Sequence, residues 1–231
     1  TARSRGLGDV YKRQDMSFGR KNEGNDWGLF SEPTPGISNS NLSYEGSLSM
    51  PEVSLESGFY DSNQLQIELE SADDGASIHF TLDGSPPTPY DLEYEYPITI
   101  NSSKVVRARS FLDGWVKSNI TTKTYLLSED PPSELPAIFI ATDHNSFFDD
   151  DTGMYMMGPN ANTWDFPYFG ANFWEDWERP IHFEILEVDG TGYDADAGVK
   201  IFGGWSRAFP QKSLSISVSY THLTLPTIRE V

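Results

Sequence analysis

Short runs in which apolar and polar residues alternate recur along the chain between residues 50 and 128. Leu65, Ile67 and Leu69 form one such run, and Ile78 and Phe80 begin the next. An alternation of period two places the apolar side chains on one face of a β-strand. Turn signals separate the runs, as is typical of a small antiparallel sandwich. The turn signals are Asp-Gly at 83–84 and 113–114 and Pro-Pro at 86–87. The other alternating apolar positions are Val53, Leu55, Leu82, Tyr96, Ile98 and Ile100. We therefore expect a small, Ig-like antiparallel β-sandwich over residues 50–128.

A second set of strand patterns fills residues 135–217. Strand-like runs cover residues 135–141, 179–188, 198–202 and 214–217. Helix signals are weak, and we expect at most one or two helical turns, over residues 171–177. The sequence therefore predicts a mainly β chain in which a second, mostly β unit follows the sandwich.

Two polar segments divide the chain. Residues 40–49 are rich in serine and asparagine and are typical of a linker. Residues 129–134 combine charge with two prolines, which cannot donate to a strand ladder, and so predict a second linker. Ahead of the first linker, residues 15–39 contain a polar turn and a short aromatic strand from Trp27 to Phe30, and we expect a hairpin there.

Composition and charge exclude several classes of function. The formal net charge of −19 repels nucleic-acid phosphates, so we expect no nucleic-acid partner. The chain has no cysteine, which removes disulfides and thiolate metal sites. No apolar run approaches the ~18 residues of a membrane span. The hydrophobic content of 37% is enough for real cores, so the chain is globular.

Both ends of the chain have an unusual character. The opening TARSRGLGDVYKRQ and the closing VSYTHLTLPTIREV resemble translated sequencing-adapter artefacts. We expect residues 1–14 and 218–231 to lie outside the fold and the intervening chain to be a fragment.

The stretch VKIFGGWSRAFPQKS, from residue 199 to residue 213, carries the clearest candidate chemistry. Gly203 and Gly204 lack Cβ atoms, which allows positive φ and a close approach of backbone N–H groups to an anion. Arg207 offers a planar fork for phosphate oxygens and Lys212 a point charge, and Ser206 lies in the same loop. Because the chain is acidic, nucleotide binding here would require Mg²⁺. A bulge or tight turn accounts for the same two glycines.

Other patterns offer weaker candidates. The run Asp149–Asp151 has hard oxygen ligands for Ca²⁺ but lacks the alternating spacing of an EF-hand loop. The four histidines show no pair at metal-ligand spacing, so no metal ligand is assigned. Aromatic residues gather between residues 164 and 177, where they fill a core or stack on sugar rings. They are Trp164, Phe166, Tyr168, Phe169, Phe173, Trp174 and Trp177.

Two family resemblances cover the first half of the chain. WGLFSEPTPGISN resembles the last hairpin of a lamin-tail domain, which assigns residues 15–39 to the end of such a domain. The pieces IHFTLDGSPPT, YPITI, VVRARSFLDGW and TKTYLL occur in the order found in the chitobiase/β-hexosaminidase C-terminal module. This second resemblance covers residues 50–128.

The region 135–217 resembles the start of the spore-coat CotH kinase family, through DDDTGMY, WERPIHFEILEVDG and AGVKIFGGWSRAFPQKSL. The resemblance implies a partial, mostly β, kinase-like N-lobe of a bacterial extracytoplasmic protein kinase. It implies ATP and Mg²⁺ as cofactors, a protein substrate, and nucleotide contacts at Gly203, Gly204, Ser206, Arg207 and Lys212. The catalytic residues are expected beyond the C-terminal end, so this fragment would be inactive. The alternative is a non-catalytic adhesion or carbohydrate-associated protein at the cell surface.

Overall fold

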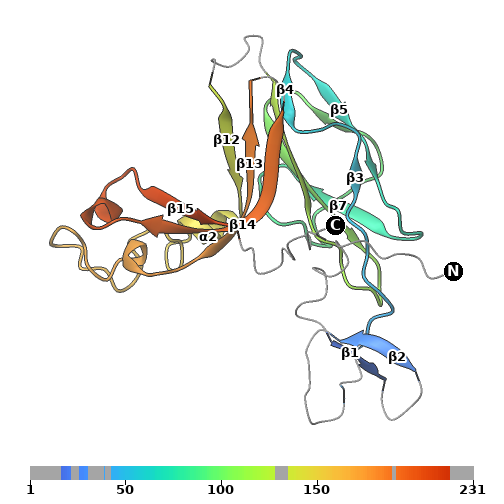
Figure 1. Ribbon diagram of the computed structural model, residues 1–231, viewed down its shortest axis with the longest axis horizontal. Helices are drawn as coiled ribbons and strands as arrows, with labels where there is room; N and C mark the ends of the chain where they lie inside the picture. Colours follow the sequence, from blue (N-terminus) through green and yellow to red (C-terminus); the bar gives the residue numbers. More distant parts are fainter. Residues whose placement is uncertain are drawn as a thin grey trace, which may run out of the picture.

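The computed structural model describes residues 17–21, 26–30, 39, 43–127, 135–188 and 191–218, which form a hairpin, a sandwich and a second β unit (Figure 1). The predicted mainly β class is confirmed. The predicted linker at 129–134, the segment 1–14 and all of 218–231 except Val218 lie outside the described residues.

The N-terminal hairpin contains β1 (Ser17–Arg20) and β2 (Trp27–Phe30), paired antiparallel with Ser17 opposite Phe30. Its aromatic strand is the one predicted from residues 27–30. Leu29 and Phe30 are buried, whereas the rings of Phe18 and Trp27 stack 5.5 Å apart on the exposed side.

Residues 43–50, most of which belong to the predicted first linker, contact both the hairpin and the sandwich. The main-chain N–H groups of Tyr44 and Leu29 each donate to the carbonyl of the other residue, at 2.7 and 3.1 Å. The Leu48 N–H donates to the Val116 carbonyl at 2.9 Å, and the Leu48 side chain is fully buried. This segment is therefore hydrogen-bonded at both of its ends.

The sandwich occupies the middle of the chain and consists of one larger sheet and two short strand pairs. The larger sheet has the order β4-β11-β10-β7-β8, and the pairs are β3-β6 and β5-β9. The strand bounds are β3 (Glu52–Val53), β4 (Gly58–Tyr60), β5 (Leu65–Ile67), β6 (Leu69–Glu70), β7 (Ser77–Thr81), β8 (Leu92–Glu93), β9 (Ile98–Ile100), β10 (Lys104–Phe111) and β11 (Thr121–Leu127).

The alternating pattern of the sequence builds the core of this sandwich. Ile67, Phe80 and Ile98 are buried together with Val106 and Tyr125, so strands from the large sheet and from the short pairs share one cluster. Burial of such side chains contributes about 1.5–3 kcal/mol each. The predicted strand position Tyr96 is instead exposed and lies outside the strands.

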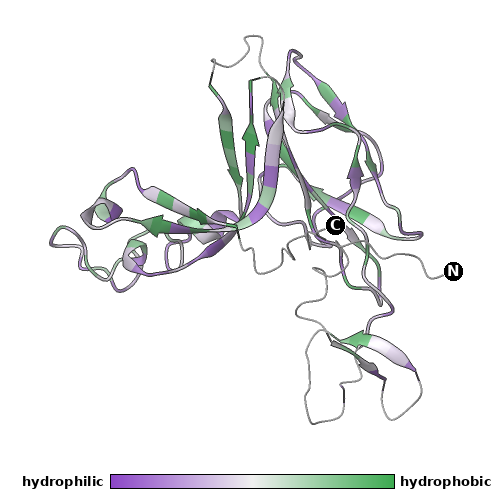
Figure 2. Cartoon of the chain, in the orientation of Figure 1, coloured by the Kyte–Doolittle hydropathy of each residue, from purple (hydrophilic) through white to green (hydrophobic). Residues whose placement is uncertain are grey.

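The second unit is a four-stranded antiparallel sheet in the order β12-β13-β14-β15. Its strands are β12 (Ala137–Ala141), β13 (Arg179–Leu186), β14 (Gly192–Phe202) and β15 (Ser213–Ser217). Figure 2 shows β12 and β13 as largely hydrophobic, whereas the upper part of β14 is hydrophilic and contains Asp194 and Asp196.

Strand β14 belongs to both parts of this unit. It pairs with β13 from Gly192 to Val199 and with β15 from Gly198 to Phe202. In Figure 1 it runs down beside β13 and then continues into an arm at the left that also contains β15. The core of this unit contains Met154, Phe173 and Ile201.

Helical structure is short, as the sequence predicted. The 3-10 helix η1 (Asn172–Trp174) lies within the predicted segment 171–177. The helix α2 (His144–Phe148) was not predicted; it begins after Asp143, whose side chain accepts a hydrogen bond from the Asn145 N–H at 2.9 Å. A second 3-10 helix, η2 (Trp205–Ala208), follows β14. Among the described residues, no helix has the length and apolar character needed to cross a membrane.

Candidate functional site

The outer face of the sandwich and one face of the second sheet meet at an interface. On β10, Val106 and Ala108 point into the sandwich core, so Arg107 and Arg109 lie on the opposite face. On β13, Ile181 packs into the core of the second unit, so His182 and Glu184 lie on its other face. The interface therefore places polar and charged side chains of one sheet against those of the other.

Glu184 connects the two sheets directly. Its carboxylate accepts hydrogen bonds from the hydroxyls of Ser57 and Thr124, and only 2% of the residue is exposed. Burial of a charge is costly unless the charge is paired or hydrogen-bonded. The two hydroxyls supply hydrogen bonds to this carboxylate and fix the position of β13 against the sandwich.

His182 lies next to Glu184 on the interface side of β13, and it is also buried. Its Nδ1 is 2.9 Å from Oδ1 of Asp196, the residue opposite it on β14. Its Nε2 lies 3.6 Å from Oδ2 of Asp194, beyond hydrogen-bonding distance, and has no hydrogen-bond partner among the described residues. The contact through Nδ1 holds the Asp196 carboxylate at the edge of the interface.

A pocket of about 340 Å³ opens beside these residues, and we call it the arginine pocket. Arg107 is anchored, because its Nε donates to Thr122 Oγ1 at 3.3 Å and its Nη1 to the Gly84 carbonyl at 2.8 Å. The buried Nε of Arg109 has no partner within the described chain. The polar lining consists of Arg107, Arg109, Asn119, Thr142, Asp143 and Asp196.

Burial and like charge both act on the two guanidinium groups. Burial lowers the pKa of Arg107, and Asp196 partly offsets that effect. Burial also lowers the pKa of Arg109, and the neighbouring Arg107 charge adds to the decrease. In the described parts of the chain, no ion pair within 4 Å joins either arginine to a carboxylate. The pocket thus holds two cations that lack a directly contacting counter-charge.

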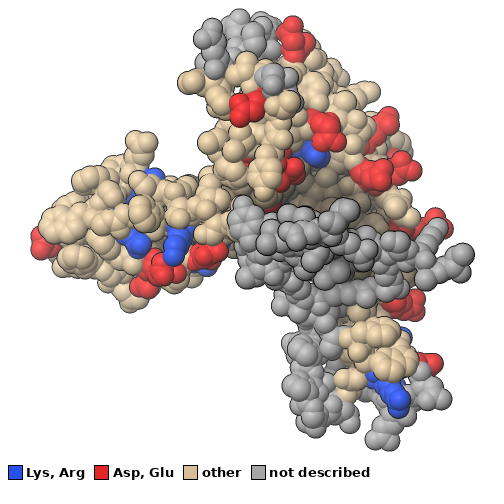
Figure 3. Space-filling view, in the orientation of Figure 1, with Lys and Arg blue, Asp and Glu red and all other residues tan. Residues whose placement is uncertain are grey.

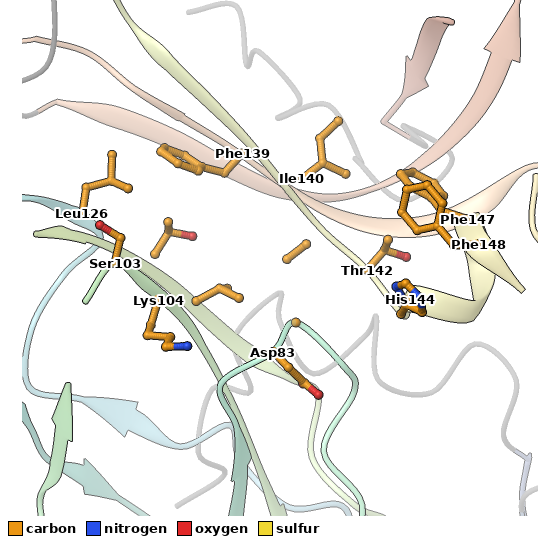
Figure 4. Close-up of a pocket in the computed structure, with 14 residues that line it drawn as sticks. Asp83, Ser103, Lys104, Leu126, Phe139, Ile140, Thr142, His144, Phe147 and Phe148 are labelled. Atoms are coloured by element: carbon orange, nitrogen blue, oxygen red, sulfur yellow. The ribbon is translucent and has the colours of Figure 1, made fainter. Parts of the chain in front are cut away.

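A second, more apolar pocket of about 400 Å³ lies along the same interface (Figure 4). Phe139 and Ile140 of β12 lie across it from Leu126 and Lys104, and Phe148 of α2 lies toward one end. It presents mainly hydrocarbon surface, with few groups that could orient a polar ligand.

The residues predicted to contact a nucleotide lie at the far end of β14, on the arm. Gly203 has φ +121°, as predicted, and the Ser206 hydroxyl occupies the space that a Cβ at Gly203 would need. Gly204, in contrast, has φ −92°, so the expectation of positive φ is wrong for this residue. The Arg207 Nε donates to the Gly203 carbonyl at 2.9 Å, and its Nη1 lies 3.3–3.5 Å from the carbonyls of residues 173–175.

Lys212 lies close to Arg207 but also faces the backbone. Its Nζ donates to the carbonyls of Arg207 at 2.6 Å and Phe209 at 3.1 Å. The ammonium group also lies 4.1 Å from the centre of the Phe173 ring. Burial lowers the pKa of Lys212. The structure brings Arg207 and Lys212 together in a network that ties the loop to η1 and to its own carbonyls.

The two cations expected to contact a triphosphate, Arg207 and Lys212, donate to backbone carbonyl oxygens in the structure. A phosphate would have to displace carbonyl oxygens from Arg207 and Lys212, the two cations proposed to bind it. No group of three or more histidine, aspartate and glutamate side chains within the described ranges could hold a metal ion. At the acidic run 149–151, Oδ1 of Asp149 already accepts from the N–H and hydroxyl of Thr152.

Exposed aromatic rings gather on the same arm. Phe166 stacks on Phe209 with ring centres 6.0 Å apart and an angle of 17°, and Trp205 contacts Phe166 edge-on at 5.8 Å. Phe166, Trp205 and Phe209 are 42%, 62% and 51% exposed, and we call these three residues the aromatic platform. Of the aromatic residues between 164 and 177, Phe173 is buried in the core, whereas Trp164 is almost fully exposed.

Sequence reasoning missed the arginine pocket and identified only part of the platform. Arg107 and Arg109 alternate with core residues on β10, a pattern that predicts outward-facing side chains but does not show what they face. Trp205 and Phe209 lie within the stretch 199–213, and the sequence alone assigned no role to either ring. Their contact with Phe166 depends on the path of the loop between residues 149 and 178.

Comparison with known proteins adds one family match. Residues 55–122 match the chitobiase/beta-hexosaminidase C-terminal domain. This range lies within the predicted module of residues 50–128 and confirms that part of the sequence interpretation. A search of curated proteins found no relative of the chain.

Proposed function

We propose that the chain is a non-catalytic, carbohydrate-associated part of a cell-surface protein, and that the aromatic platform binds a glycan. The stacked, exposed rings of Phe166, Trp205 and Phe209 carry the proposal. Aromatic faces pack well against the C–H faces of sugar rings, and exposed apolar clusters mark binding surfaces. The family match of the neighbouring sandwich, to a domain of chitobiase and β-hexosaminidase, favours an amino-sugar polymer as the ligand.

In this proposal the sandwich acts as a support. The hydrogen bonds of Glu184 fix the second unit to the outer face of the sandwich, and β14 continues from that contact to the arm that carries the platform. Binding sites are commonly placed on loops that a rigid scaffold positions. Extracellular location belongs to the same proposal, because a polymer of this kind lies outside the cell.

The acidic surface is compatible with a neutral glycan as partner. Figure 3 shows acidic side chains spread over the visible face of the sandwich, while basic side chains are few and several lie beside acidic ones on the arm. Such a surface repels polyanions at long range. A neutral sugar can stack on the aromatic rings despite the acidic surface, because stacking does not depend on charge.

Binding to insoluble chitin tests the proposal. We expect the full chain to sediment with chitin, and Trp205→Ala and Phe209→Ala each to weaken retention about tenfold, since one aromatic contact contributes roughly 0.5–1.5 kcal/mol beyond its burial. The matched control is Tyr90→Ala, which removes an almost fully exposed ring on the sandwich. Equal retention of all four proteins would contradict the platform as the binding surface.

A further inference from the structure

The arginine pocket contains a charge arrangement that the fold does not complete. Arg107 and Arg109 are two residues apart on β10 and face the same side, so their positive charges are neighbours. Both are removed from bulk water on one side by the second sheet. Like charges in a partly desolvated site repel more strongly than in water. An anion placed between them would relieve this repulsion.

Arg109 is the group available to such an anion. The Arg107 guanidinium uses Nε and Nη1 for Thr122 and Gly84, whereas the Arg109 guanidinium makes no hydrogen bond to the described chain and its Nε is buried. A guanidinium group binds a carboxylate through two parallel hydrogen bonds. The buried Nε is closed off from a ligand, so a carboxylate in the pocket would bind through the two Nη groups of Arg109.

The remaining walls fit the rest of a sugar ring. The carboxylates of Asp143 and Asp196 can accept hydrogen bonds from sugar hydroxyls, and His182 holds Asp196 in place. Asn119 adds a side-chain amide. Pro86, Ile120 and Pro180 supply apolar surface for the C–H face of a ring. The volume of about 340 Å³ is at the lower end of the range of ~300–1,000 Å³ for small-molecule pockets.

We propose that the arginine pocket binds a carboxylate-bearing sugar of the uronic acid type, with the carboxylate on Arg109 and the hydroxyls on Asp196, Asp143 and Asn119. Only the choice of a sugar rests on the proposed function; the choice of a carboxylate rests on the Arg109 guanidinium, which has no hydrogen-bond partner in the described chain. The pocket lies at the interface of the two sheets, whereas the aromatic platform lies on the arm. The two sites can therefore be tested separately.

The inference is tested by titrating the full chain separately with glucuronate, glucose and inorganic phosphate. Backbone amide NMR spectra monitor each titration. We expect glucuronate to bind in the millimolar range and to shift amides of β10 and β14, and glucose to bind at least tenfold more weakly because it lacks the carboxylate. Equal binding of glucose and glucuronate would overturn the inference. Phosphate binding as tight as that of glucuronate would show a simple anion site and would also overturn it, as would the absence of any shift.

Variants assign the contact to Arg109. We expect Arg109→Gln to weaken glucuronate binding at least tenfold and Lys104→Gln, which removes a positive charge from the same strand outside this pocket, to leave it within twofold. If Arg109→Gln does not fold, the salt dependence of binding to the wild-type chain tests the same contact. Added salt must weaken glucuronate binding and must leave glucose binding unchanged. Trp205→Ala is expected to lose chitin and keep glucuronate, so failure of one site is distinguishable from failure of the other.

Discussion

Glu184 of β13 accepts a hydrogen bond from the Thr124 hydroxyl of β11, so a buried carboxylate joins the second sheet to the sandwich. Ser57, which precedes β4, donates to the other oxygen of the same carboxylate. The relative position of the two sheets thus depends on three polar side chains that are far apart in the sequence.

Thr124→Val tests this connection. The valine has nearly the same shape but cannot donate, which leaves one oxygen of Glu184 buried without a partner. We expect a loss of about 1–3 kcal/mol in the free energy of unfolding. Urea unfolding measures the loss, and Thr99→Val on the exposed side of β9 is the control, with no expected change beyond about 0.5 kcal/mol. An unchanged midpoint for Thr124→Val would show that Glu184 does not hold the interface.

The turn that carries Gly84 predicts a pH effect. Hydrogen bonds from the Ser85 hydroxyl and N–H lower the pKa of Asp83. Because the folded-state pKa lies below the unfolded value, this interaction stabilises the fold fully above the unfolded pKa and is lost as pH falls through the folded pKa. We expect Ser85→Ala to raise the Asp83 pKa in an NMR titration, and an equal pKa in both proteins would contradict the assigned cause.

Gly84 itself is a second test of that turn. Its φ is +88°, and its carbonyl accepts the hydrogen bond from Arg107. An alanine at this φ costs about 1–2 kcal/mol of stability. We expect Gly84→Ala to lower the melting temperature by several degrees. Ala72→Gly lies outside the regular strands and is the control for a one-carbon change, with a smaller expected effect.

Lys212 tests the nucleotide prediction. The structure shows its ammonium group bound to two carbonyls and to the Phe173 ring, so we expect Lys212→Ala to lower stability by about 1–3 kcal/mol. Because Arg207 and Lys212 are engaged in this way, we expect Mg-ATP to leave the melting temperature of the chain unchanged. A rise with Mg-ATP in the wild type that disappears in Lys212→Ala would instead support a nucleotide site.

Most of the longer strands were predictable because they carry their own alternation, whereas the short strands β4 and β8 were not predicted. Ile78 and Phe80 on β7, and Ile181 on β13, face their cores as the period of two indicates. The helix α2 escaped prediction because a five-residue helix has too few positions to show a helical period. The glycine-containing loop lies between two strands as predicted, but the carbonyl partners of Arg207 come from η1, more than 30 residues earlier.

The two proposed binding regions could not be read from the chain for the same reason. The sequence marks Arg109 as outward-facing, but only the packing of β13 and β14 against the sandwich turns that outer face into a pocket. Likewise, Phe166 meets Phe209 across a sequence separation that no local pattern describes. Local periodicity specifies the faces of strands, and tertiary packing decides which faces meet.

Strand β14 has a mechanical consequence. One half of it is hydrogen-bonded to β13, beside the sandwich, and the other half to β15, on the arm that carries the exposed rings. A pulling force applied at the arm and directed along β14 therefore reaches the sandwich through one unbroken backbone.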